Sequence, residues 1–237
     1  MPSASLLLHN YQVLRERIDS ACAKAGRSRD SVRLLAISKF HPVEAIETVA
    51  EAGQIDFGEN YVQEAEVKKR RLASAFPDLR WHMTGHVQRK KAAQVAGNYA
   101  LVHTLDSIAL ADGMEKKLLS ENAFQPVLIE VNIAGEEQKA GIPIADLEKF
   151  GTHILEDCPH LQLRGLMCLP PVYDSGEKAR PFFARLRELR DGLEKNLQHP
   201  LPELSMGMSG DFPWAIMEGA TIVRIGTDIF GPRPPKN

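Results

Sequence analysis

Residues 32–60 read VRLLAISKFHPVEAIETVAEAGQIDFGEN, and this stretch decides how the chain should fold. A short apolar run at 32–37 is followed by a longer helical pattern and then by a second short apolar run at 55–57. Strands that alternate with helices in this way predict a parallel sheet, because a parallel neighbour is usually reached through a crossover helix. The number of such units decides between a closed barrel and an open sheet.

The same unit recurs along the whole chain. Segments 143–156 and 179–197 carry apolar residues at helical spacing, the first with Pro143 at its first turn. An open, doubly wound sheet is the alternative to a barrel, but no GxGxxG follows the first strand. Eight units in 237 residues instead favour an α/β fold of the (β/α)8 TIM-barrel type. Its strands are expected at 32–37, 55–57, 80–83, 100–103, 127–132, 163–168, 203–205 and 221–225.

An amphipathic helix is expected before the first strand. Within residues 1–27 apolar side chains recur every three or four positions, and Gly26 is placed to end the pattern. We therefore expect a single domain over 1–237, in which this helix precedes a barrel at 32–231. The spaced residues are Leu7, Tyr11, Leu14, Ile18, Cys22 and Ala25.

Composition excludes several classes of protein. A net charge of -2 gives no overall field for nucleic acid or anionic lipid, and the basic run at 68–71 is typical of a solvated helix face. Three cysteines without a CxxC spacing argue against a disulfide framework and a zinc site. No segment suits a signal peptide or a membrane span. We expect a cytoplasmic monomer without metal, nucleic-acid partner or membrane partner.

Side chains that do chemistry in such barrels lie where the strands end and the loops begin. Lys39 follows the first strand directly, so we expect it at the barrel mouth. Burial there would lower the pKa of its ammonium group and leave a neutral amine that condenses with aldehydes. A solvated surface lysine is the alternative. Asn60 and His82 are expected near the same mouth, where a structural role for the histidine is favoured over an acid or a metal ligand.

The last two strands carry residues that are candidates for a phosphate site. Ser209 is a candidate N-cap of a helix that contains Trp214, and the chain turns at Gly226 and Thr227. Barrel enzymes commonly bind phosphate with the loops after strands seven and eight, although ordinary capping and turn chemistry is the alternative. Arg224 lies within the final strand and keeps its charge, so it needs either a partner inside the barrel or a salt bridge outside. Strand alternation leaves both open.

Six segments, in order, span nearly the whole chain: LLAISKFHP, FGENYVQE, WHMTGHVQRKK, VNIAGEEQKAG, LRGLMCLP and GMSGDFPWAIMEGATIVRIGTDIFG. Together they resemble the pyridoxal phosphate homeostasis protein family, single-barrel relatives of the N-terminal domain of bacterial alanine racemase. The resemblance departs from the family pattern at the rim after the third strand. Thr84 stands where the family usually has Ile or Val, and Arg89 and Lys90 replace a small polar residue and Asn. These departures put the contacts of that rim in doubt, but not cofactor binding.

The resemblance implies roles for individual residues. Lys39 matches the lysine that holds pyridoxal 5′-phosphate (PLP) as a Schiff base, and Arg224 matches the arginine that faces the pyridine nitrogen. The remaining matches are Ser209, Gly226 and Thr227 around the phosphate, and Asn60, His82 and Met208 near the ring.

The resemblance also implies a PLP-binding protein of intracellular PLP homeostasis, with little or no catalysis. Permanently cationic Arg224 would keep the pyridine nitrogen unprotonated, which weakens the cofactor as an electron sink. The racemases take a second base from a C-terminal domain, for which this chain has no room. A PLP-dependent amino-acid racemase is the alternative, and the barrel alone also admits a Schiff-base aldolase with a phosphorylated sugar substrate. PLP-dependent apo-enzymes are the expected recipients of the cofactor.

Overall fold

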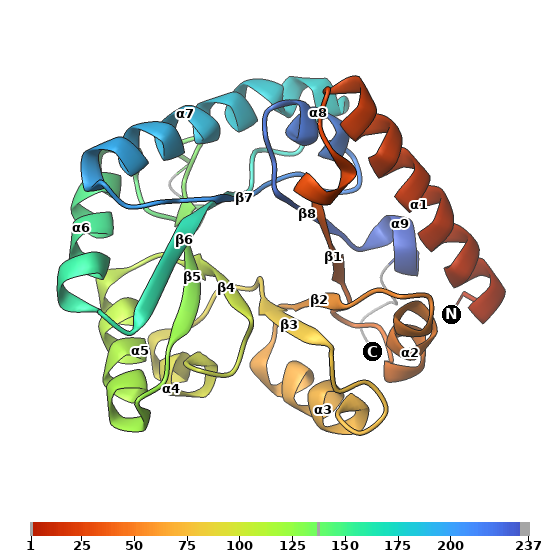
Figure 1. Ribbon diagram of the computed structural model, residues 1–237, viewed down its shortest axis with the longest axis horizontal. Helices are drawn as coiled ribbons and strands as arrows, with labels where there is room; N and C mark the ends of the chain where they lie inside the picture. Colours follow the sequence, from red (N-terminus) through yellow and green to blue (C-terminus); the bar gives the residue numbers. More distant parts are fainter. Residues whose placement is uncertain (1, 137, 233–237) are drawn as a thin grey trace.

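Eight parallel strands close into a barrel in the computed structural model, which describes residues 2–136 and 138–232 (Figure 1). Each strand pairs with the next, and the last pairs with the first. The expected (β/α)8 fold is therefore confirmed. The strands are β1 (Arg33–Ile37), β2 (Asp56–Glu59), β3 (Arg80–Met83), β4 (Leu101–Leu105), β5 (Gln125–Val131), β6 (Leu161–Cys168), β7 (Glu203–Ser205) and β8 (Ile222–Ile225).

Helices alternate with the strands and form the outer ring (Figure 1). Short 3-10 turns lie at 29–31, 89–91, 144–146 and 176–179. The α-helices are α1 (Ala4–Lys24), α2 (Val43–Glu51), α3 (Val62–Leu72), α4 (Ala92–Val95), α5 (Ile108–Glu121), α6 (Leu147–Asp157), α7 (Arg180–Leu197), α8 (Phe212–Met217) and α9 (Thr227–Phe230).

The elements differ from the expected ones mainly at their ends. The expected helix at 143–156 opens as a 3-10 turn, because Pro143 stands before that turn as its N-cap and α6 begins only at Leu147. Strand β2 extends to Glu59, beyond its apolar run, because this carboxylate is buried. The expected N-terminal helix is present, and Gly26 follows it with a φ of +65°, a conformation that glycine adopts without strain.

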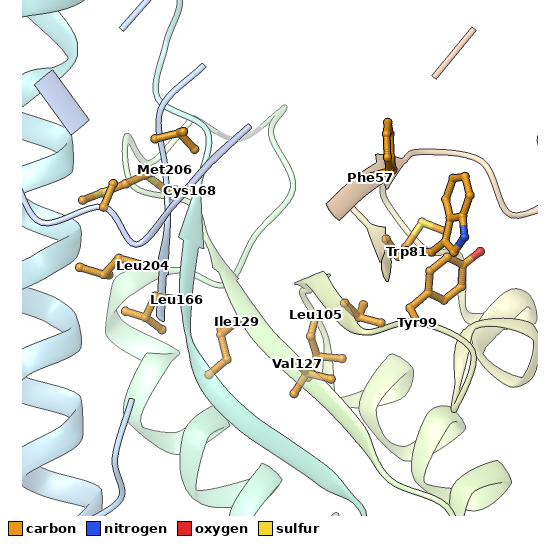
Figure 2. Close-up of a cluster of buried hydrophobic side chains, with 14 of the residues drawn as sticks. Phe57, Trp81, Tyr99, Leu105, Val127, Ile129, Leu166, Cys168, Leu204 and Met206 are labelled. Carbon is orange, nitrogen blue, oxygen red and sulfur yellow. The ribbon is translucent and has the colours of Figure 1, made fainter. Parts of the chain in front are cut away.

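Two apolar layers hold the barrel together. The outer layer lies between strands and helices; Figure 2 shows part of it, including Leu166 of β6 and Leu204 of β7. Helix α1 joins this layer by packing against α2, α8 and α9 (Figure 1). The inner layer fills the barrel itself, since alternate side chains of each strand point inward. It consists of Leu35, Leu101, Leu128, Met167 and Ile222.

The inner layer fixes which other residues face into the barrel. Lys39 continues the inward-facing series of Leu35 on β1, Glu130 lies two residues after Leu128 on β5, and Arg224 lies two residues after Ile222 on β8. All three are therefore directed to the inside, near the carboxyl ends of their strands. Across the described residues, every helix is too short or too polar to cross a membrane.

Candidate functional site

A cavity of about 240 Å³ opens at the carboxyl ends of the strands. It is formed by residues at or after β1, β2, β3, β6, β7 and β8. Of the eight residues expected at a site, seven line this cavity, and one does not. The seven are Lys39, Asn60, Met208, Ser209, Arg224, Gly226 and Thr227, and their neighbours in the wall are Ile37, His41, Thr84, Leu169 and Gly210.

Lys39 lies in a tightly fixed turn at the end of β1. The main-chain N–H of Phe40 donates to the Glu64 carboxylate at 2.6 Å, and the N–H of His41 donates to the Ser38 carbonyl at 3.1 Å. These bonds hold Phe40 at a φ of +66°, a left-handed conformation that is costly for a side chain of this size. The partly buried side chain of Lys39 is thereby presented to the cavity from a rigid base.

A buried ion pair lies beneath this turn. Lys68 Nζ is 2.7 Å from Glu59 Oε1 and 2.6 Å from Glu64 Oε1, and it donates to the Ser38 carbonyl at 2.7 Å. The Ser38 hydroxyl donates to the same Glu59 oxygen at 2.6 Å. Burial nevertheless raises the pKa of the Glu59 carboxyl, against the attraction of Lys68. The prediction of a solvated basic face is wrong for Lys68, whose side chain is 5% exposed because it reaches inward to this pair.

The loops after β7 and β8 meet at the opposite wall of the cavity. Ser209 is not the N-cap of α8, which was the expectation; Asp211 occupies that position, and its carboxylate accepts the Met208 N–H at 2.6 Å. This bond folds the loop back, and the Ser209 hydroxyl accepts instead from the N–H of Asp228 at 3.4 Å. A Cβ at Gly226 would lie 3.2 Å from a main-chain oxygen of β1, so this turn approaches β1 closely.

Arg224 lies inside the barrel, which decides between the two orientations left open by the sequence. Its guanidinium donates to the Ser205 hydroxyl and to the Cys168 carbonyl, each at 2.8 Å. Burial lowers the pKa of the guanidinium. Nearby, burial and the charge of Asp106 raise the pKa of Glu130 to about 7, although Arg224 acts in the opposite direction.

The expectation that His82 lies at the mouth is wrong. Its ring is buried in the barrel, 3.0 Å from Asp56 Oδ1, and it borders an opening at the amino ends of the strands together with Arg80. Strand alternation correctly places His82 on the inward face, but it does not give the height of a side chain along the barrel axis. Asp56, at the first position of β2, holds the ring toward the amino end.

Comparison with known proteins identifies the family of this barrel. Residues 5–234 match the family described as alanine racemase, N-terminal domain. The pyridoxal phosphate homeostasis protein of Aquifex aeolicus is 45% identical over 218 residues, which cover 92% of this chain and 94% of that protein. The chain belongs to the pyridoxal phosphate homeostasis protein family. The member from Haemophilus influenzae is 40% identical, with 95% of both chains covered.

Solved structures place the family fold beside the racemases. PipY of Synechococcus elongatus, with PLP bound, is 36% identical and superposes with a TM-score of 0.80, covering 90% of this chain and all of PipY. Alanine racemase of Corynebacterium glutamicum is 15% identical with a TM-score of 0.70, and 62% of its chain is covered. The second likeness shows a shared fold alone. The resemblance inferred from the six sequence segments is confirmed.

The departures from the family pattern fall at one rim of the cavity. The Thr84 hydroxyl contacts the Asn60 side-chain oxygen at 3.1 Å and the Glu59 carbonyl at 3.2 Å. An Ile or Val at this position could make neither bond. Lys90 lines a second cavity of about 750 Å³ that also reaches Asn60. Thr84 and Lys90 thus place a hydroxyl and an ammonium group on the side of the barrel that carries Asn60.

Some functional candidates had no clear sequence signal. Leu169 was not singled out from the sequence, although it directly follows the strand predicted to end at residue 168, and Glu130 is a buried carboxyl group within the apolar strand β5. A further group formed by residues far apart in sequence lies on the outside of the barrel, where ligand atoms of Asp112, His153 and Cys158 lie within 4.8 Å of one another. His153 there lies 2.8 Å from Asp112 and 2.9 Å from Asp157, so each of its ring nitrogens already has a carboxylate partner. The absence of a bound metal stays a prediction.

Proposed function

We propose that this protein binds PLP in the mouth cavity, with the amine of Lys39 joined to the cofactor aldehyde as a Schiff base, and that it serves intracellular PLP homeostasis with little or no catalysis. The observation that carries the proposal is the convergence of Lys39, Arg224 and the Ser209 loop on one cavity. Binding of PLP by PipY and the names of the relatives support it.

The donors in the wall fit the chemistry of PLP. The cofactor supplies an electrophilic aldehyde, which a lysine amine can trap. The hydroxyls of Ser209 and Thr227 and the main chain at Gly226 supply neutral donors of the kind that bind phosphate. Arg224, a donor only, suits an unprotonated pyridine nitrogen. Because the net charge is -2, the phosphate must be held by such local contacts.

The same residues disfavour strong catalysis. A guanidinium beside the ring nitrogen keeps that nitrogen unprotonated, so a carbanion formed on the cofactor would be poorly stabilised. A racemase is nevertheless the second candidate, because the titratable side chain of His41 also lines the cavity and could act as a second base. Exchange of the α-hydrogen of an amino acid into deuterium oxide, lost in Lys39→Ala and in His41→Phe, would establish that alternative; we expect no exchange.

The visible spectrum of the purified protein, recorded with and without borohydride, tests the binding proposal. Wild type should absorb as a protonated Schiff base, and borohydride should fix the cofactor covalently. Lys39→Ala should lose the covalent linkage, whereas Lys90→Ala, which removes a rim lysine, should keep it. A wild-type protein that stays colourless and takes up no added PLP would overturn the proposal.

The proposal extends to what the protein does with the cofactor. It acts as a cytoplasmic monomer that passes PLP to PLP-dependent apo-enzymes, and the open mouth of the cavity is compatible with release. Loaded protein mixed with an apo-enzyme should restore activity faster than dilution into buffer releases PLP. Sedimentation of apo and loaded protein should give one species with the mass of a single chain.

A further inference from the structure

A chain of buried polar side chains crosses the barrel interior and ends at Arg224. Asp56 Oδ1 lies 3.0 Å from His82 Nε2, and His82 Nδ1 lies 3.0 Å from His103 Nε2. His103 Nδ1 lies 2.8 Å from Ser205 Oγ, which is 2.8 Å from Arg224 Nη1. None of the five is more than 5% exposed. The chain draws one residue from each of β2, β3, β4, β7 and β8, and so ties together five of the eight strands.

The hydrogen bonds of this chain can run in one direction only. Arg224 can only donate, so the Ser205 oxygen accepts from it; because Asp56 accepts at the far end and both rings are neutral, the Ser205 hydroxyl donates to His103 Nδ1. His103 then carries its proton on Nε2 and donates to His82 Nδ1. His82 in turn carries its proton on Nε2 and donates to Asp56, whose ionised carboxylate can only accept. Every donor meets an acceptor with both rings neutral, and burial lowers the pKa of both histidines accordingly.

The hydrogen bonds of Arg224 go to uncharged oxygens and not to a carboxylate. A buried guanidinium is usually paired directly with a carboxylate, which would neutralise it. Here the recorded partners of Arg224 are two uncharged oxygens, of Ser205 and Cys168, and the carboxylate of Asp56 lies three neutral side chains away. One edge of the guanidinium is therefore fixed by uncharged oxygens, while the carboxyl groups of Glu130 and Asp211 act on it through their charge rather than as its hydrogen-bond partners. Arg224 also lines the mouth cavity.

We propose that Ser205 and His103, supported by His82, are positioning residues that aim Arg224 at the ring nitrogen of the bound cofactor. This inference rests on the PLP binding proposed above. None of the three touches the cavity, so they act only through the arginine. The chain acts by orientation, because its hydrogen-bond direction fixes the plane of the guanidinium. Loss of any internal link lets the guanidinium rotate away from the ring nitrogen.

A ligand pair isolates this effect. PLP and its carbocyclic analogue, in which a C–H replaces the ring nitrogen, differ only in the atom that Arg224 is proposed to contact. Wild type should bind PLP about tenfold or more tightly than the analogue, since a hydrogen bond to a charged donor is lost. Ser205→Ala and His103→Leu should reduce that ratio to about twofold, and Ser205→Thr, which keeps the hydroxyl, should restore it.

The control is Ser209→Ala, in the phosphate part of the cavity. It should weaken binding of both ligands equally and leave their ratio at the wild-type value. Thermal unfolding of each apo variant shows whether it folds; should Ser205→Ala not fold, His103→Leu carries the test. A wild-type affinity ratio in both Ser205→Ala and His103→Leu would overturn the inference and leave the proposal of PLP binding intact. A wild-type protein that binds neither ligand would instead overturn the proposed function.

Discussion

Lys68 and Arg224 are both buried cations of the barrel, yet their hydrogen-bond partners differ. Lys68 touches two carboxylates, Glu59 and Glu64, at 2.7 Å and 2.6 Å. Arg224 donates to two uncharged oxygens, of Ser205 and Cys168, and the carboxylate of Asp56 closes the far end of the hydrogen-bonded series that begins at Ser205. The Lys68 ammonium group is paired directly with carboxylates inside the protein. The Arg224 guanidinium has no carboxylate among its described hydrogen-bond partners, and it lines the mouth cavity.

The two regions are therefore specialised for different tasks. The Lys68 pair holds the turn that carries Lys39, because the same ammonium group bonds the Ser38 carbonyl. Its contribution should appear in the stability of the protein. The Arg224 chain should appear mainly in ligand recognition. Four changes test this contrast.

The largest effect is expected from Lys68→Met. It leaves the carboxylate of Glu59 buried and unpaired, which should cost about 3–5 kcal/mol of unfolding free energy. Because the pKa of Glu59 is already raised by burial, losing Lys68 should raise it further. Above the usual pKa of a glutamate, the native state of the variant then binds more protons than its unfolded state. The loss of unfolding free energy should therefore be larger at pH 8 than at pH 5.

Urea unfolding at both pH values measures this deficit. Arg71→Met is the matched control, because it removes a cation from the same helix whose partner, Glu44, is exposed like itself. The control should change stability little at either pH. An equal change in the two variants would show that the buried pair is not the structural element that we describe.

Glu130→Gln should stabilise the protein at alkaline pH. The pKa of Glu130 is raised to about 7, so its ionisation is disfavoured in the native state and stability falls as pH rises from about 4.5 to 7. Removing the ionisable group should raise the free energy of unfolding by roughly 3 kcal/mol at pH 8 and by almost nothing at pH 4. Urea unfolding between pH 4 and pH 8 measures this gain, and Glu156→Gln, at an exposed position, is the control. A gain independent of pH would refute this account.

Ser38→Ala should have an intermediate effect. It removes the hydroxyl that donates to Glu59 Oε1 at 2.6 Å, and loss of a hydrogen bond to a charged group should cost about 2 kcal/mol. Combined with Lys68→Met, the loss should be smaller than the sum, because both changes act on the same carboxylate. Strict additivity in a double-mutant cycle would show that the two contacts are independent.

The smallest effect is expected from Arg80→Met. Arg80 pairs with Asp56 at 2.7 Å, but its side chain is half exposed, and such pairs contribute less than about 1 kcal/mol. His82 still donates a hydrogen bond to Asp56, so the hydrogen bonds from Arg224 to Asp56 keep their direction. The preference for PLP over its carbocyclic analogue should persist. A large loss of that preference would show that the half-exposed Arg80, and not His82 alone, is needed to hold Asp56 in place.

The sequence predicts well what depends on local pattern. The strand and helix spacing is repeated eight times, so the barrel follows even though individual ends shift by about two residues. Seven of the eight site residues converge because each stands at a strand end or in a loop at the same mouth. Whether these seven hold a cofactor stays a prediction. Their convergence is the part that the structure adds.

The wrong predictions share a physical cause: the polarity of a side chain does not show how deeply it is buried or where along the barrel axis it lies. Lys68 stands in a run of four basic residues that is typical of a solvated face, yet it lies on the buried face of α3, where its side chain contacts Glu59. His82 alternates correctly but is drawn to the amino end by Asp56. Ser209 was expected as a cap, a role that Asp211 takes because its carboxylate reaches the Met208 N–H. Each outcome depends on a partner distant in sequence or on a choice between two caps.

The seam between β1 and β8 has a consequence for synthesis. Lys39 follows the first strand, whereas Arg224, Gly226 and Thr227 come from the end of the chain, and the two strands pair side by side in the closed barrel. A ribosome exposes the lysine long before it releases the residues that complete the cavity. The nascent chain therefore carries the amine before its cavity is complete, and the proposed capture of the PLP aldehyde in that cavity requires that translation has delivered β8.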